Sequence, residues 1–219
     1  MNIIWVSPLG NDGTADGSRT LPYLTIDAAL VAVFVSGDQI RLEEGTYTPA
    51  GTTVFAGVDG SLFSEVPGGA IIDPVTITDD NACVSITRSN RFLIQGVKVT
   101  YTGTVSSDIY GIYMNAVSDT KCAFCTVYGL YALRNDAYGI YGNGTGRVIG
   151  CEVYDLSSSS LIRGIKVNVM NPIDCDVHDL VGDPNTCDVI GIEHACARNS
   201  APTVVRAVVV TMVPPPVMT

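Results

Sequence analysis

The chain has 219 residues, a formal net charge of −10 and a pI near 4.4. Hydrophobic residues make up 47% and charged residues only 16%, so a single domain with a long buried core is expected. The acidic balance argues against nucleic acid, which requires clustered Lys and Arg, and against an anionic membrane surface. No apolar run approaches the roughly 20 residues of a transmembrane helix, so no membrane partner is expected.

Residues 1–37 predict an N-terminal strand followed by a capping helix. The chain passes from Met1 directly into a strand ending at Val6, without the features of a secretory signal peptide. Turn signals follow at Asp12-Gly13, without the regular acidic spacing of a calcium loop. Thr25 is expected to N-cap a short amphipathic helix, Ile26–Val35. This helix would cover the core at the open end of a sheet.

Residues 38–212 predict the β-rich body of the protein. Gln39–Thr48 is the first clear strand segment, and residues 49–82 are rich in Gly and Pro. We therefore expect one irregular coil there, with a protruding loop near 57–69. Val204–Met212 is the last expected strand. Three prolines at 214–216 cannot continue a ladder, so residues 213–219 form a Pro-rich tail.

Two short templates repeat through the body. The first, Gly-Ile-x-x-Asn, begins at Gly111, Gly139 and Gly164, with degenerate copies at Cys83 and Gly191. The starts are therefore 28, 28, 25 and 27 residues apart. The second template, Cys-x-Val-x-x-Leu, follows each full copy of the first. A period of this length, built from short β-rich segments, predicts a parallel β-helix in which each coil buries its face on the next.

The repeat resembles the right-handed parallel β-helix of the pectin-lyase-like superfamily over nearly the whole chain. Three asparagines that end the first template, Asn115, Asn143 and Asn168, are similar to the asparagine ladder of that superfamily. Asn tolerates a left-handed backbone at a bend and can hydrogen-bond its equivalent one coil away. The resemblance implies an all-β solenoid with coils of about 25–28 residues and a short N-terminal capping helix. Members include polysaccharide lyases and hydrolases, phage tailspikes and other virion proteins, and adhesins.

The alternation of side chains along a strand assigns each repeated position to a face. The expected inward columns are Ile112, Ile140, Ile165 and Ile192; Cys125, Cys151 and Cys175; and Val127, Val153 and Val177. The expected outward columns are Ser85, Tyr113, Tyr141, Lys166 and Glu193; Thr126, Glu152 and Asp176; and Tyr128, Tyr154 and His178. Neighbouring rungs are about 4.8 Å apart, so equivalent residues touch.

The seven cysteines are interpreted as reduced thiols. Inward cysteines on successive rungs lie too far apart for the Cβ separation of about 3.8 Å that a disulfide prefers. They would behave as small hydrophobic residues in a protein that folds in a reducing cytoplasm. Cys122 and Cys125 form a lone C-x-x-C, which on one strand would place the two sulfurs on opposite faces. Without a second pair at zinc-ligand spacing, neither a metal nor a cofactor is expected.

The best catalytic candidates are Glu152, Asp176, His178 and Tyr154. Carboxylates one rung apart would lie near the separation of about 5 Å used by retaining glycosidases. His178 could act as an acid or a base. The alternative is an ordinary solvated strand face. The pattern lacks the ladder of Asp residues that would hold calcium, and Arg163-Gly-Ile-Lys166 matches the polygalacturonase Arg-x-Lys element only loosely. No catalytic residue is therefore favoured.

Tyrosine suggests a binding surface. Eight of the ten tyrosines lie between residues 101 and 154, where charge is sparse, a composition typical of an interface core. The expected contact residues are Tyr113, Tyr128, Tyr141 and Tyr154, together with Val208 and Val210 on the open last strand. The outward aromatic residues could instead hold a surface glycan.

These features favour a non-enzymatic structural protein of a bacteriophage virion, either a capsid decoration protein or a short spike or fibre module. Such a protein folds in the host cytoplasm and leaves by lysis, which reconciles the fold with reduced cysteines. The expected partners are further copies, as a trimer, and other virion proteins. The alternatives are an extracellular polysaccharide lyase or glycoside hydrolase, or a glycan-binding module without turnover.

Overall fold

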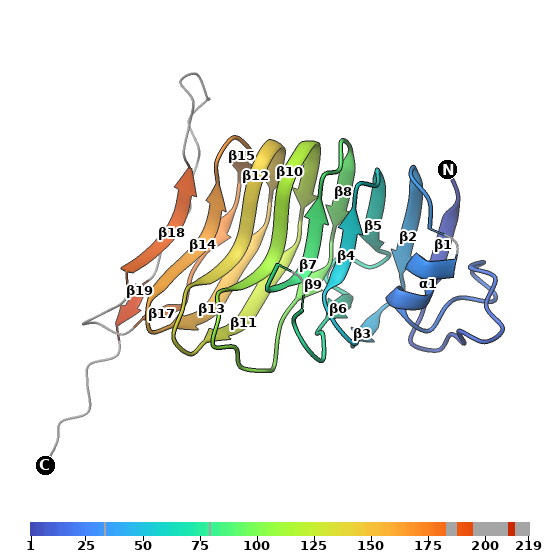
Figure 1. Cartoon of the computed structure of the whole chain (residues 1–219), viewed down its shortest axis with the longest axis horizontal. Coiled ribbons are helices and arrows are strands. Elements are labelled where there is room, and N and C mark those ends of the chain that lie inside the picture. Colours follow the sequence, from blue (N-terminus) through green and yellow to red (C-terminus); the bar gives the residue numbers. More distant parts are fainter. Residues whose placement is uncertain (33, 79, 183–187, 195–209, 213–219) are drawn as a thin grey trace, which may run out of the picture.

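A computed structural model describes residues 1–32, 34–78, 80–182, 188–194 and 210–212. Its strands lie side by side along the long axis of the molecule, with the N-terminal strand at one end (Figure 1). Every strand pair in the described part is parallel, and each strand pairs with its equivalent one coil away. The right-handed parallel β-helix predicted from the repeat is confirmed.

Two sheets form the walls of the helix. The main path of the first sheet is β1 (Ile3–Val6), β2 (Asp38–Leu42), β5 (Gly60–Ser64), β8 (Phe92–Gln95), β10 (Ile109–Ala123), β12 (Ala137–Ile149), β14 (Leu161–Val167) and β18 (Asp188–His194). Beside this path lie β4 (Thr53–Ala56), β7 (Ala82–Thr87) and β15 (Asn171–Ile173). The second sheet runs β3 (Gly45–Tyr47), β6 (Ala70–Ile72), β9 (Lys98–Val99), β11 (Thr126–Ala132), β13 (Glu152–Ser158), β17 (Leu180–Gly182) and β19 (Val210–Met212), with β16 (Asp176–Val177) beside β13.

The inward columns follow the sequence repeat. Ile112 pairs with Ile140, Ile140 with Ile165, and Ile165 with Ile192. The first three of these isoleucines are fully buried, and Ile192 packs against the same core. The predicted isoleucine column is therefore confirmed.

The glycine of the first template packs against the valine of the second. A Cβ atom on Gly139 would lie 2.4 Å from Val153 Cγ1, and one on Gly164 would lie 2.3 Å from Val177 Cγ1. Any side chain at the glycine position would collide with the opposite sheet. The two templates recur together because they form the two sides of one close contact across the core.

Helix α1 (Ile26–Ala32) begins as predicted and ends earlier. The Thr25 hydroxyl accepts a hydrogen bond from the Ala28 amide at 3.1 Å, which is an N-cap contact. The predicted end at Val35 is wrong. The helix ends at Ala32, and Phe34 beyond it packs its ring against Phe55, with the ring centroids 5.7 Å apart.

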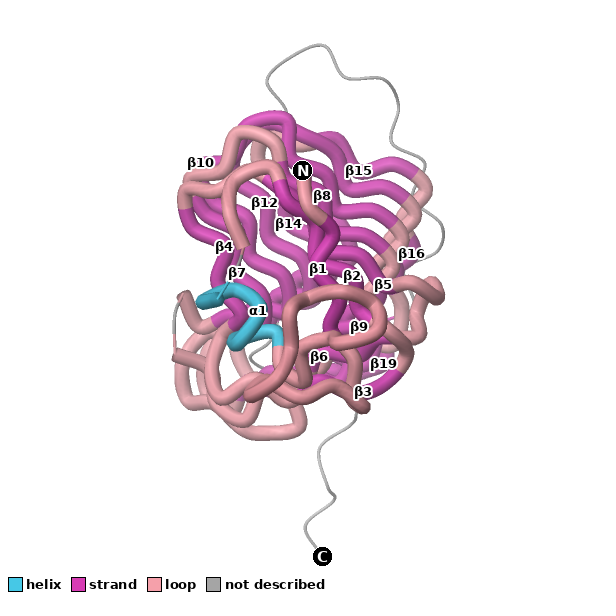
Figure 2. The backbone as a smooth tube through the Cα atoms, turned by 90° about the vertical axis from the view of Figure 1, so that its right-hand side faces the viewer, coloured by secondary structure: helices cyan, strands magenta, loops and turns pink. Residues whose placement is uncertain are grey.

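The loop after β1 also closes the N-terminal end. The Trp5 amide donates to Gly17 O at 2.9 Å, and the Ser7 amide donates to Tyr23 O at 2.8 Å. These bonds occupy the edge of β1 that would otherwise be open. Figure 2 looks onto this end and shows α1 beside the strands rather than covering all of them. The cap therefore consists of the helix and the loop together.

The irregular coil expected at 49–82 is more regular than predicted. No loop protrudes at 60–64, because β5 lies in the first sheet between β2 and β8. Leu62 pairs with Ile40 and Ile94 and is fully buried. Burial of this side chain holds the segment in the ladder despite its glycines.

At the C-terminal end, β19 pairs with β17, placing Val210 opposite Leu180. Residues 204–209 of the predicted last strand, including Val208, and the Pro-rich tail lie outside the described residues. Among the described helices, none has the length and apolar character needed to cross a membrane.

Candidate functional site

The second sheet carries a stacked aromatic column on its outer face. The Tyr128 and Tyr154 ring centroids are 5.4 Å apart with an interplanar angle of 13°. The Tyr154 and His178 centroids are 5.1 Å apart at 6°. Both faces of the Tyr154 ring are therefore covered by its neighbours. The ring edges, rather than the faces, point away from the sheet.

His178 lies between two carboxylates. Its Nδ1 is 2.8 Å from Asp179 Oδ2, and its Nε2 is 3.4 Å from Glu152 Oε1. The hydrogen bond with Asp179 raises the pKa of His178; the Glu152 contact acts in the same direction, and burial opposes both. The protonated imidazolium is thus favoured, which suits a proton donor or an ion pair better than a base.

The structure brings together most of the predicted catalytic candidates. Glu152 and Asp176 are register partners on β13 and β16, and Tyr154 stacks on His178. Asp179 was not predicted from the sequence. It occupies a left-handed turn position with φ 50°, where strand alternation assigns no face. The catalytic role of these residues remains a hypothesis.

The first sheet carries a cluster of four tyrosines, Tyr110, Tyr113, Tyr138 and Tyr141, which we call the tyrosine cluster. Tyr110 stacks on Tyr138 with centroids 4.6 Å apart at 13°, and Tyr113 stacks on Tyr141 with centroids 5.2 Å apart at 12°. The two stacks meet edge to face, with Tyr110 and Tyr141 centroids 5.6 Å apart at 70°. The cluster is thus a preformed aromatic surface held by mutual ring contacts.

A polar network borders the tyrosine cluster. Arg163 Nη1 donates to the Tyr138 hydroxyl at 2.9 Å, and this hydroxyl donates to Asp136 Oδ2 at 2.9 Å. Burial and the Asp136 contact raise the pKa of Tyr138 to about 12. Lys166 and Glu193 are register partners as predicted, but Glu193 forms its ion pair with Arg163. The guanidinium of Arg163 forms ion pairs with both Asp136 and Glu193 and so neutralises the charge at this end of the cluster.

The first outward column also contains a residue that is not exposed. Ser85 is completely buried, although its register partner Tyr113 lies on the outer face. Its hydroxyl lies 2.8 Å from Asp80 Oδ2 and donates to that carboxylate. An outward position near the chain connections can therefore be covered by a loop.

The three repeated asparagines form a ladder. Asn143 Nδ2 donates to Asn115 Oδ1 at 3.0 Å, and Asn168 Nδ2 donates to Asn143 Oδ1 at 3.3 Å. The expectation of a left-handed backbone at these residues is wrong, since none of the three has a positive φ. The bend after the first of them falls instead on Ala116, at φ 53°.

Four cysteines gather inside the helix. Cys125, Cys151 and Cys175 are each 1% exposed and free, as is the fully buried Cys122. The prediction that Cys122 and Cys125 point to opposite faces is wrong. Phe124 adopts φ 54° between β10 and β11, and this corner turns both sulfurs inward. In the described part of the chain, no three His, Cys, Asp or Glu side chains are arranged to hold a metal ion.

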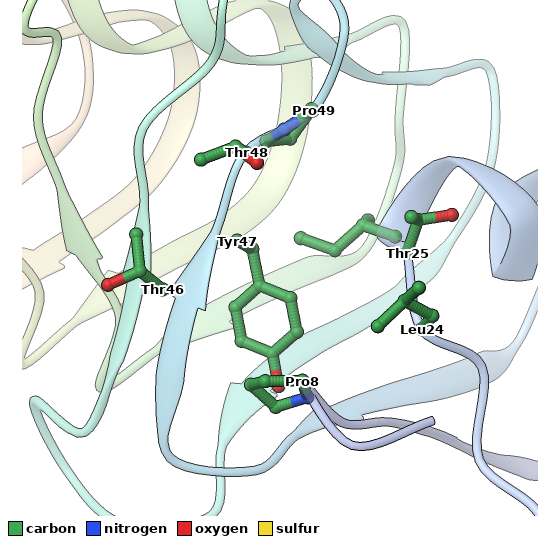
Figure 3. A pocket seen from close by; sticks show the side chains of 8 residues that line it. Pro8, Leu24, Thr25, Thr46, Tyr47, Thr48 and Pro49 are labelled. Carbon is green, nitrogen blue, oxygen red and sulfur yellow. The ribbon is translucent and has the colours of Figure 1, made fainter. Parts of the chain in front are cut away.

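Three surface cavities lie at the N-terminal end, and neither the tyrosine cluster nor the stacked column of Tyr128, Tyr154 and His178 lines them. One has a volume of about 240 Å³ and is seen in Figure 3 between the segment at Leu24-Thr25 and strand β3. The Tyr47 ring forms a wall beside Pro8 in this view. Its hydroxyl is held by Val6 O at 2.9 Å and Glu43 O at 2.8 Å. The wall is therefore rigid.

The fold and the outer faces together define a parallel β-helix protein with a tyrosine cluster on one sheet and a stacked aromatic column on the other. No family model matches the sequence, and no curated protein matches it. Pectate lyase Pel9A is similar with a TM-score of 0.49 and 15% identity, over 97% of this chain and 77% of that one. Pectin methylesterase PemA from Erwinia chrysanthemi is similar with a TM-score of 0.46 and 11% identity, over 93% of this chain and 92% of that one. A rhamnogalacturonan lyase is similar with a TM-score of 0.37 and 14% identity, over 97% of this chain and 66% of that one. These similarities concern the course of the backbone alone.

Proposed function

We propose that the protein is a non-enzymatic structural component of a bacteriophage virion, either a capsid decoration protein or a short spike or fibre module. In this proposal three copies associate side by side through the tyrosine cluster. The observation that carries the proposal is the mutual stacking of Tyr110 on Tyr138 and of Tyr113 on Tyr141. Tyrosine is enriched in the cores of protein interfaces, where ring area and a hydroxyl group are both used.

The ring orientation favours a protein partner over a glycan. A sugar that stacks on an aromatic side chain needs an open ring face. In the tyrosine cluster, each ring gives one face to the equivalent ring on the neighbouring rung. Tyr138 is buried and its hydroxyl is bonded to Arg163 and Asp136. The ring edges available to a partner are therefore those of the partly exposed Tyr110, Tyr113 and Tyr141. Edges suit the interdigitation and hydrogen bonding of a packed interface. The cluster therefore fits a second protein surface better than a sugar ring.

The thiols support folding in a reducing compartment. The five cysteines of the described residues are free and buried, and burial raises the pKa of Cys83. A β-helix stabilised by packing alone needs no oxidising environment. Assembly in a host cytoplasm before lysis satisfies this condition.

The oligomer is tested by light scattering after size-exclusion chromatography. Wild-type protein should be a trimer, and Tyr113→Ser with Tyr141→Ser should shift it to monomer. Tyr131→Ser is the matched control, because Tyr131 is 42% exposed and lies on the second sheet. A wild-type monomer at all concentrations, or a trimer unaffected by the double substitution, would refute the lateral interface.

The virion role is tested separately by mass spectrometry of phage particles purified from the source culture. The chain should be a stoichiometric component of the particle. Its absence from purified particles would refute this role, even if the trimer formed.

A second candidate function rests on the contact of His178 with Glu152, one rung from Asp176. This group could process a polysaccharide as a lyase or a glycoside hydrolase. The test is turnover of acidic and neutral polysaccharides, with and without calcium. Activity that disappears in both Glu152→Gln and Asp176→Asn would replace the structural proposal, whereas no turnover agrees with it.

A further inference from the structure

In the described part of the chain, exposed large hydrophobic side chains are concentrated near the N-terminus. Of the thirteen large hydrophobic side chains exposed in the described part of the chain, seven belong to residues 1–35. Leu9 is 95% exposed and Leu24 is 41% exposed. Scattered exposed hydrophobic side chains are ordinary, but a local concentration marks an interaction surface.

Two of the cavities at this end adjoin and share Pro8. The first, of about 240 Å³, is lined by Pro8, Leu24, Thr25, Ile26, Thr46, Tyr47, Thr48 and Pro49. The second, of about 530 Å³, includes Pro8, Leu9, Arg19, Glu43, Glu44 and Val66. We call them together the Pro8 groove. Its first part has apolar walls and hydroxyl groups, without a charged side chain (Figure 3).

We propose that the Pro8 groove binds the Pro-rich segment 213–217 of a second copy of this chain. Residues 210–219 read Val-Thr-Met-Val-Pro-Pro-Pro-Val-Met-Thr and carry no charged side chain. Three consecutive prolines preset an extended polyproline II backbone, so little conformational entropy is lost on binding. Grooves that recognise such segments are lined by aromatic and apolar side chains, like Tyr47, Leu24 and the prolines here.

The polar groups of the groove match the backbone of this segment. A proline-rich chain presents carbonyl oxygens that lack internal partners. Thr46 and Thr48 are exposed at the rim of the groove, and Figure 3 shows the Thr46 side chain on the side of β3 away from the Tyr47 ring. A carbonyl of the segment can therefore reach these hydroxyls at the rim, not beside Tyr47.

Charge also favours this occupant. The adjoining part of the groove contains Glu43, Glu44 and Glu65, and the whole chain carries a net charge of −10. An acidic segment would be repelled from this surface. A neutral segment of an otherwise acidic protein can approach it.

The segment must come from another copy. Strands β3 and β19 are the two ends of the second sheet, separated by six strand-to-strand steps. At about 4.8 Å for each step, these ends lie roughly 29 Å apart. Residues 213–216 in a polyproline II conformation span only about 12 Å. The segment therefore reaches a groove in the next molecule, giving a head-to-tail contact that does not depend on the tyrosine cluster.

The test uses a synthetic peptide of residues 210–219 and the full chain. Trp5 is the single tryptophan, and the Arg19 guanidinium carbon at the groove lies 4.6 Å from its ring centroid, so its fluorescence should report binding. The peptide should bind in a saturable manner, and a peptide with all three prolines replaced by glycine should bind at least tenfold more weakly. By light scattering, full-length protein should grow beyond the trimer as its concentration rises, and deletion of residues 213–219 should abolish only this further growth.

Substitutions at the groove distinguish specific docking from non-specific hydrophobic binding. Leu24→Gln and Leu9→Gln should each weaken peptide binding about tenfold, which corresponds to about 1.4 kcal/mol. Val31→Gln is the matched control, because Val31 is 89% exposed on α1 and does not line the groove. Equal binding to the Leu24 and Val31 variants would overturn the proposal, as would the absence of peptide binding. Loss of lateral trimers in the tyrosine variants leaves this result unaffected.

Discussion

Cys122 Sγ lies 3.7 Å from Cys151 Sγ, although 29 residues separate the two cysteines in the chain. The two cysteines meet because they lie on neighbouring coils and because the corner at Phe124 turns Cys122 toward the core. Cys122 occupies the inward column of Ile94 and Val148, its register partners on the neighbouring coils. A thiol here serves as a small apolar side chain between two larger ones.

We predict that these thiols react only when the protein unfolds. Burial keeps all four thiols away from a reagent, and for Cys175 hydrogen bonding to Cys151 and burial also raise the pKa. Iodoacetamide labelling followed by mass spectrometry should find Cys122, Cys125, Cys151 and Cys175 unmodified in buffer and modified in urea. Rapid labelling of any of the four in buffer would show that the core is open at that coil.

The fold could be predicted from the sequence because the period carries most of the information. Residues one coil apart occupy equivalent positions, so Ile140 and Val153 could be assigned to the core without knowing the path of the chain. The prediction failed where the backbone departs from simple alternation. The corner at Phe124 reverses the face of Cys122, and the sequence marks this corner only by a single aromatic residue between two cysteines.

Only Tyr113 and Tyr141 of the tyrosine cluster were predicted from the sequence, again because the backbone departs from simple alternation. Gly111 and Ile112 both face the core, so Tyr110 and Tyr113 both face outward despite their spacing of three. Strict alternation from Ile112 would place Tyr110 inside. The signal that could have found it is its repeat: Tyr110, Tyr138 and Arg163 each precede the template glycine.

The middle asparagine of the ladder should contribute most to stability. Asn143 bonds to Asn115 on one side and to Asn168 on the other, whereas Asn168 shows one ladder bond. Asn143→Ala should lower the free energy of unfolding by about 1–3 kcal/mol, because two partly buried partners lose a bond. Asn168→Ala should cost about half as much. Urea denaturation measures both, and equal losses would argue that the bonds between asparagines contribute little.

A charge in the isoleucine column should prevent folding. Ile140 is fully buried, and Ile140→Asp would place an unpaired carboxylate in the core at a cost of several kcal/mol. Insoluble or unfolded protein is expected by circular dichroism. Arg147→Asp is the control on the same strand, since Arg147 is exposed and should tolerate the change. A soluble, folded Ile140→Asp protein would contradict the assigned strand face.

The ion pairs of His178 should make stability depend on pH near neutrality. Asp179 and Glu152 raise the pKa of His178 in the folded protein. The folded protein therefore binds the His178 proton more tightly than the unfolded chain does. The resulting stabilisation is complete below the ordinary histidine pKa of about 6.5 and is lost as the pH rises through the folded value. For a partly exposed pair it should not exceed about 1 kcal/mol.

Urea denaturation between about pH 6 and pH 8 isolates this contribution, since few other side chains titrate there. His178→Gln should remove the part of the slope that His178 causes. Asp179→Asn should reduce it more than Glu152→Gln does, because the Asp179 contact is 2.8 Å and the Glu152 contact is 3.4 Å. A slope unchanged in His178→Gln would show that the stacked imidazole gains nothing from the two carboxylates. If Glu152→Gln instead reduced the slope more than Asp179→Asn, the contact of His178 with Glu152 on the neighbouring coil would be the one that stabilises the protonated imidazole.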